Sequence, residues 1–293
     1  SAEDFEKIPG SPVAYWLSQG VFLAFKDGQK FESLAPTRKG MVTARNSIYV
    51  RSWVEVSYSE AGFDHLMSRD DAMSSNKKWF SYLKGGGFRR WYGNKFDLVN
   101  WENDGQDLQT TRHPTEDRVW ATNFNLDYIF RTNVNWGAIA SSGFSARYSG
   151  GGELFDAGGS ACFPISAHPK AVTAFLNSKV TGRLLEALNP TLNFQAGNIS
   201  DLPVLKVIEE GALISSADTA IQLSVFDWDA YETSWDFTTL PLLSPEHRDQ
   251  TLAGSFARLR AHWQGMTDEM QRLEEENNRI FIDAYGLQDE LTP

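Results

Sequence analysis

The stretch that decides how this chain is understood runs Lys77-Lys-Trp-Phe-Ser-Tyr-Leu-Lys-Gly-Gly-Gly-Phe-Arg-Arg-Trp-Tyr-Gly-Asn-Lys95. It interleaves six cations with six aromatic residues around a triple glycine. Lys and Arg neutralise phosphates, Arg can donate two hydrogen bonds to guanine, and glycine lets backbone amides approach closely, so the mixture suits polyanion binding. The competing interpretation is a glycine-rich hairpin whose aromatic side chains are core and whose cations are solvated. Composition alone does not decide between the two.

Short strands are expected on both sides of this stretch. The alternating run Ser47–Val56 is typical of a strand, and glycine or Asn/Asp-Gly steps such as 103–105 and 150–152 indicate turns at close intervals. Residues 100–105 predict a strand followed by a turn, with Trp101 in the core. A further strand is expected at Leu202-Pro-Val204.

Helical patterns dominate the later part of the chain. Apolar residues at helical spacing predict one helix over Ala171–Leu188, and a further helix is expected over Ser215–Phe226. Ser244-Pro-Glu246 has the composition of a helix start, because Ser is a good N-cap and Pro fits the first turn. From there to Tyr285 we expect one long helix or a pair. The fold class is therefore α+β: a mixed, sheet-rich domain with interspersed helices over residues 1–240, then a helical spacer or tail over 241–293.

The charge is unevenly distributed along the chain. Its net value is -11, but residues 38–95 hold eleven Lys and Arg against five Asp and Glu, whereas residues 201–293 hold six against eighteen. A basic front is thus masked by an acidic back half, and the distribution matters more than the total for polyanion binding.

Composition also bears on compartment and completeness. Cys162 is the single cysteine, which excludes an intrachain disulfide and a Cys-rich zinc site and fits a reducing, cytoplasmic location. No apolar stretch approaches the roughly 18 residues of a membrane span, so no membrane partner is expected. The chain begins at Ser1 rather than Met, which suggests a piece of something longer.

Recognisable catalytic motifs are missing. Amino-group methylation of DNA needs a Gly-rich loop for S-adenosylmethionine and an Asn/Asp-Pro-Pro-aromatic motif that holds the flipped base. Asn189-Pro-Thr191 lacks the second Pro and the aromatic residue, and the glycines of 150–159 do not lead from a long apolar strand into a helix. The five histidines are scattered, and carboxylate pairs such as Asp227-Trp-Asp229 are common on solvated surfaces. We therefore expect no catalytic centre, metal site or cofactor site in this chain.

Ordered sequence blocks resemble the PglX-type adenine-specific DNA methyltransferases of BREX phage-defence systems, in their part downstream of the catalytic domain. The blocks are Pro12–Trp16, Gly40–Asn46, Arg51–Val56, Lys78–Asn94, Val99–Gly105, Ser142–Tyr148, Asn189–Phe194, Asp227–Phe237 and Glu274–Arg279. In such enzymes this region forms a target-recognition domain with a helical spacer. The resemblance implies a module that docks on double-stranded DNA, reads a short site and presents one adenine to the catalytic domain for N6 methylation.

This sequence departs from the family pattern at two points, which limits the residue roles that the resemblance implies. Thr43-Ala-Arg-Asn46 stands where the family usually has Thr-Gly-Asp-Asn, so the turn gains the cation Arg45. The cofactor and base-binding motifs are absent, so S-adenosylmethionine is expected in a missing catalytic domain, which would be a partner of this chain within the parent enzyme.

The leading hypothesis is that the basic front contacts DNA phosphates while a few polar side chains read base edges. The positioning candidates are Lys77, Lys78, Lys84, Arg89, Arg90 and Lys95, with Arg51, Arg147 and Arg45 as further DNA-binding candidates. The main alternative is a protein-interaction module, whose acidic helical half docks on other BREX proteins or is bound by a phage-encoded inhibitor. An aromatic-rich carbohydrate-binding module is a third possibility, against which the lack of a leader and of disulfides counts.

Overall fold

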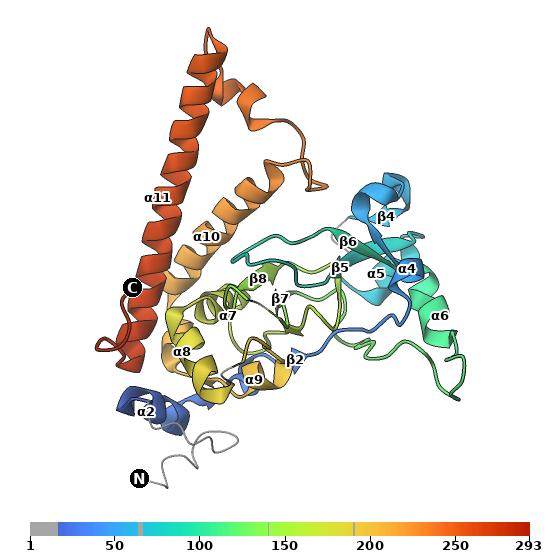
Figure 1. Cartoon of the computed structure of the whole chain (residues 1–293), viewed down its shortest axis with the longest axis horizontal. Coiled ribbons are helices and arrows are strands. Elements are labelled where there is room, and N and C mark those ends of the chain that lie inside the picture. The colour runs from blue at the N-terminus through green and yellow to red at the C-terminus, as the bar shows by residue number, and fades with distance from the viewer. Residues whose placement is uncertain (1–16, 64–66, 140, 190) are drawn as a thin grey trace.

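Two sheets and a helical layer make up the computed structural model, which describes residues 17–63, 67–139, 141–189 and 191–293. The sequence block Pro12–Trp16 and the residue Pro190 lie outside the described residues. The predicted α+β class is confirmed (Figure 1).

The first sheet contains the opening stretch. β5 (Trp79–Leu83) pairs antiparallel with β6 (Asp97–Asn100), from Trp79 opposite Asn100 to Tyr82 opposite Asp97. β3 (Val50–Ser52) continues the sheet beyond β6, while β4 (Ala61–Gly62) and β9 (Leu154–Phe155) run parallel to β5. All five residues of β5 are buried, so this strand lies within the core and the basic residues 84–95 form the connection to β6.

The second sheet has the strand order β2 (Thr37–Arg38), β10 (Ala161–Cys162), β7 (Asn133–Trp136) and β8 (Ala146–Ser149), all antiparallel. A separate pair joins β1 (Gln29–Lys30) to β11 (Pro203–Val204), which confirms the strand predicted at residues 202–204.

Helices cover the second sheet and extend away from it. α7 (Pro169–Leu176) and α10 (Gly211–Asp229) pack together, and α11 (Leu252–Tyr285) contacts both α8 (Lys179–Leu188) and α10. α10 and α11 lie close at one end and diverge toward the other (Figure 1). The remaining helices are α2 (Gln19–Asp27), α3 (Phe31–Leu34), α4 (Asn46–Tyr49), α5 (Arg69–Ser74), α6 (Glu102–Thr110) and α9 (Ala196–Ser200), with short 3₁₀ turns at Trp53–Glu55, Tyr58–Glu60, Lys206–Glu209, Pro241–Leu243 and Pro245–His247.

Three hydrophobic clusters hold these layers, and two of them are large. The larger joins α2, α7, α8, α10 and the second sheet to the last turns of α11, including Leu273, Phe281 and Tyr285. The other lies under the first sheet and includes Phe80, Tyr82 and Trp101. The predicted boundary near residue 240 falls between α10 and α11, and that division stays a prediction.

Local polar side chains explain where the observed helices and strands differ from the expected ones. The helix predicted over 171–188 is two helices, because the Ser178 hydroxyl accepts from the Thr181 amide and starts α8 anew. Residues 47–56 form α4, β3 and a 3₁₀ turn rather than one strand. The start expected at Ser244 gives only a 3₁₀ turn, and α11 begins at Leu252, where Thr251 accepts from the Gly254 amide. The predicted helix over 215–226 is confirmed within the longer α10.

The prediction for residues 100–105 is confirmed in its main features. β6 ends at Asn100, and Asn103, Asp104 and Gly105 then adopt left-handed backbone conformations at the start of α6. Trp101 is 1% exposed and lies in the core, as predicted.

Candidate nucleic-acid interface

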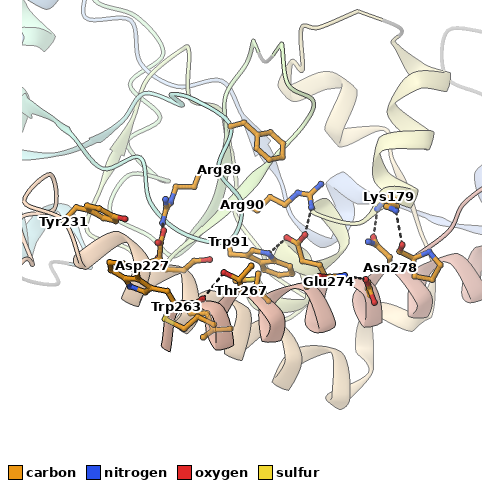
Figure 2. Close-up of a pocket in the computed structure, with 18 residues that line it drawn as sticks. Arg89, Arg90, Trp91, Lys179, Asp227, Tyr231, Trp263, Thr267, Glu274 and Asn278 are labelled. Carbon is orange, nitrogen blue, oxygen red and sulfur yellow. Dashed lines mark hydrogen bonds and ion pairs between the residues drawn. The ribbon is translucent and has the colours of Figure 1, made fainter. Parts of the chain in front are cut away.

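The two arginines of the opening stretch hold the β5–β6 connection on the helical layer. Arg89 donates to Asp227 on α10 at 2.7 Å and lies over the Trp228 ring, 5.0 Å from its centroid. Arg90 donates to Glu274 on α11 at 2.8 Å, and the indole of Trp91 donates to the same carboxylate at 2.9 Å. Figure 2 shows these side chains pointing from the connection toward the two helices. Both arginines are therefore already bound to carboxylates of the chain.

Lys95 is buried in an internal ion pair. Its ammonium group lies 2.8 Å from Glu153, and the two side chains are 12% and 4% exposed. Burial lowers the pKa of Lys95, but the Glu153 carboxylate outweighs that effect, so the pKa lies above its ordinary value and the lysine stays charged. In this conformation Lys95 neutralises Glu153 rather than an external anion.

Arg147 is the most enclosed of the predicted cations, with 1% of its surface exposed. It donates to the Asn135 side chain and to the Arg89 carbonyl, and one guanidinium nitrogen has no hydrogen-bond partner among the described residues. Burial and the neighbouring Arg89 charge lower the pKa of Arg147 to about 10. Arg147 forms no ion pair among the described residues, and a phosphate outside the chain cannot reach it without a rearrangement.

Four other predicted cations lie around the first sheet. Lys77 donates to the Ser59 carbonyl at 2.7 Å, and Lys78 lies 3.4 Å from Glu102. Arg51 donates to two backbone carbonyls and lies over the Trp79 ring, while the exposed Arg45 lies over the Trp120 ring. All four are at least partly exposed, and each has only a weak or neutral partner.

Lys84, the remaining candidate, lines a cleft of about 640 Å³ together with Lys39. Neither lysine forms an ion pair within the part of the chain that the structure describes. Lys84 acts on Asp97 only at longer range: burial raises the pKa of that carboxyl, and the Lys84 charge opposes the rise. The other residues around the cleft are Gly86, Gly137, Ala138, Ile139, Ala157, Gly158, Ser160, Asn193, Gln195, Ala196 and Gly197.

Gly85 allows a close backbone approach beside this cleft. Gly85 has φ of 85°, and a Cβ there would lie 2.7 Å from the Gly158 carbonyl oxygen and 2.9 Å from the Gly137 Cα. A side chain at this position would be strained and would push apart the connections that form the cleft. Gly85 therefore lets its own backbone and those of Gly137 and Gly158 meet beside Lys84.

Sequence reasoning did not single out Lys39, Asn193 and Gln195. Lys39 belongs to the basic front and Asn193 to a family block, so both carried a signal. What was missing is their meeting in space, which depends on β2 and β7 both pairing with β10.

The glycines of 150–152 do not fit an S-adenosylmethionine loop. The amide of Gly152 donates to the Phe130 carbonyl and that of Gly151 to the Ser149 hydroxyl, so neither points at a ligand. The segment leads from β8 to β9 rather than into a helix. The side-chain amide of Asn189 is likewise engaged, with Asn193 and Asn198.

No group of three His, Cys, Asp or Glu residues positioned to hold a metal ion occurs among the described residues. Within those same residues, no helix is both long and apolar enough to cross a membrane.

Comparison with known proteins places the chain beside adenine-specific methyltransferases. It is 38% identical over 296 residues to the adenine-specific methyltransferase PglX of Lacticaseibacillus casei (strain Zhang), an alignment that covers 99% of this chain and 24% of that protein. It is 33% identical over 294 residues to the adenine-specific methyltransferase BrxX of Escherichia coli O9:H4 (strain HS), covering 99% of this chain and 22% of that protein. No family model matches. The predicted resemblance to PglX-type methyltransferases is confirmed, for a chain that spans about a quarter of the length of these curated relatives.

Proposed function

We propose that this chain is the target-recognition part of a PglX-type adenine-specific DNA methyltransferase, and that duplex DNA contacts it at the cleft of Lys39 and Lys84. The observation that carries the proposal is the alignment of 99% of the chain with a segment of two adenine-specific methyltransferases. S-adenosylmethionine binding and N6 methyl transfer then belong to the rest of the parent enzyme, in a cytoplasmic anti-phage system.

The chemistry of the cleft supports this assignment. DNA-binding proteins position themselves through phosphate contacts and read sequence through hydrogen bonds to base edges. Lys39 and Lys84 supply cations that form no ion pair among the described residues, and Asn193 supplies an amide group of the kind that pairs with adenine edges. The Gln195 side chain is already engaged with the Asn198 amide in a capping box. Arg45, Arg51, Lys77 and Lys78 are further candidates for phosphate contacts around the first sheet.

Arg89, Arg90, Lys95 and Arg147 receive a different role in this proposal. Their partners are Asp227, Glu274, Glu153 and the Asn135 side chain, so they position the β5–β6 connection that carries Lys84. We therefore do not propose direct phosphate contacts for these four residues.

Exchanging this region between two relatives tests the proposal. The parent methyltransferase, with and without a relative's equivalent of residues 17–293, is expressed in cells whose DNA is then sequenced for methylated adenines. The modified motif is expected to change to that of the donor. An unchanged motif, with methylation retained, would contradict target recognition by this region.

A further inference from the structure

We infer that Ile139 and Asn193 together read one A·T base pair in the major groove, with Asn193 at the adenine edge and Ile139 at the thymine methyl group. The inference rests on the proposed function, because both residues line the cleft of Lys39 and Lys84. It assigns a specificity-determining role to Ile139, a residue that the proposed phosphate contacts do not involve.

Ile139 presents an exposed aliphatic side chain at this cleft. It is 75% exposed, the highest value among the large apolar side chains in the described part of the chain. Single exposed apolar residues are ordinary on protein surfaces, so exposure alone carries no function. The position of Ile139 in a cleft with two lysines is what points to a ligand.

The charge in the cleft complements DNA. The described lining residues include Lys39 and Lys84 but no Asp or Glu. Two carboxyl groups lie outside the lining: Asp156 accepts a hydrogen bond from the Gly158 amide at 2.7 Å, and Asp97 interacts with the Lys84 charge at longer range. A polyanion therefore meets lysines on either side of the uncharged pair Ile139 and Asn193.

Ile139 and Asn193 lie directly opposite each other in an antiparallel bridge. Side chains of such a pair stand on the same face, with their Cβ atoms roughly 4.5–5.5 Å apart. The Asn193 side chain forms no hydrogen bond within the described residues, whereas its backbone carbonyl accepts from the Asn189 side chain and its amide donates to the Thr191 hydroxyl. An aliphatic group and an available amide are thus presented side by side.

The backbone under this pair is held in place by hydrogen bonds. The Ala138 amide donates to the Gly158 carbonyl at 2.9 Å, and the Ala138 carbonyl accepts from the Phe194 amide at 2.7 Å. The Trp136 indole donates to the Phe194 carbonyl at 2.9 Å. Because the backbone is fixed and a β-branched side chain has few rotamers, Ile139 loses little conformational freedom when it meets a ligand.

The two side chains match the groups that an A·T pair displays. In the major groove adenine offers an acceptor at N7 and a donor at N6, which an Asn amide contacts together, and thymine offers its 5-methyl group to an apolar side chain. A G·C pair has no methyl group and a different order of donors and acceptors. Insertion of Ile139 between stacked bases would cost unstacking energy and would make no use of the amide beside it.

Removal of single methyl groups from the DNA tests the inference in the full-length methyltransferase. Each thymine of the methylated motif, on either strand, is replaced in turn by deoxyuridine, and binding is followed by fluorescence anisotropy at constant salt. Deoxyuridine at one position is expected to weaken binding about fourfold, the effect of exposing one methyl group to water. Replacement of that base pair by G·C should weaken binding by about tenfold or more.

Variants then assign the effect to the two residues. Ile139→Ala should bind the thymine and deoxyuridine duplexes equally, and Ile139→Val should keep part of the preference. Asn193→Ala should reduce the discrimination against G·C at the same base pair. The matched control is Ile165→Ala, an exposed isoleucine (64%) that does not line the cleft, and it should keep the full preference for thymine.

Failure of this inference and failure of the proposed function give different results. If Lys39→Ala with Lys84→Ala weakens binding, but no thymine responds to loss of its methyl group or Ile139→Ala still responds, the A·T assignment is wrong and the DNA cleft stands. If the lysine variant binds DNA unchanged, the cleft itself is wrong. Loss of DNA bending in Ile139→Ala, measured by energy transfer between the duplex ends and without any deoxyuridine effect, would overturn the assignment in favour of insertion between bases.

Discussion

The cations at residues 89–95 of the β5–β6 connection and the two lysines of the cleft, Lys39 and Lys84, all belong to the basic part of the sequence but differ in what surrounds them. Arg89, Arg90 and Lys95 each meet a carboxylate from a distant part of the chain. Lys39 and Lys84 meet none among the described residues and line an open cleft. The same residue types thus tie segments together in one region and remain available to a ligand in the other.

The comparison shows that a function can be assigned to a basic run of sequence only when the partners of its individual cations are known. The acidic part of the chain, which accounts for the negative net charge, supplies Asp227 and Glu274 to the arginines of the basic part. A cation already paired inside the protein would have to give up that partner before it could bind phosphate, whereas a free one releases only water and counterions.

The largest loss of stability is expected at the most buried ion pair of the β5–β6 connection, between Lys95 and Glu153. Glu153→Gln would leave the Lys95 charge buried without its carboxylate, which should lower the free energy of unfolding by about 3–5 kcal/mol in urea denaturation. Lys95→Met combined with Glu153→Gln should recover much of that loss, because no uncompensated charge remains. A loss below about 1 kcal/mol for Glu153→Gln would place Lys95 among the available cations instead.

A smaller loss of stability is expected where the β5–β6 connection contacts α11. Glu274→Gln weakens the acceptor shared by Arg90 and Trp91, and because both ionised side chains are roughly one-third exposed, the expected loss is about 1–2 kcal/mol. Glu276→Gln is the matched control on the same helix, since Glu276 pairs with its exposed neighbour Arg279. Equal losses for the two variants would show that the connection is not held by Glu274.

Sequence patterns predicted the elements whose cause is local. Trp101 entered the core, residues 203–204 form a strand, and the apolar spacing of 215–226 gave part of α10. Single side chains changed the boundaries: a hydroxyl at Ser178 divides one predicted helix, and Thr251 rather than Ser244 starts the last.

The roles of the cations could not be predicted in the same way. Arg90 and Glu274 are separated by 184 positions, and their pairing depends on how α11 packs on α8 and α10. Lys39 and Lys84 come together through β2, β10 and β7, none of which forms a long, strongly patterned strand. Family resemblance identified the module, but only the tertiary structure separates its engaged cations from its free ones.

The most direct test of this account is the salt dependence of DNA binding by the full-length methyltransferase. Lys39→Ala with Lys84→Ala should reduce the slope of log K against log salt by about two units, without a change in thermal stability. Arg89→Ala with Arg90→Ala should leave the slope unchanged while lowering stability. The reverse pattern, a slope reduced by the arginine pair and untouched by the lysine pair, would contradict the account.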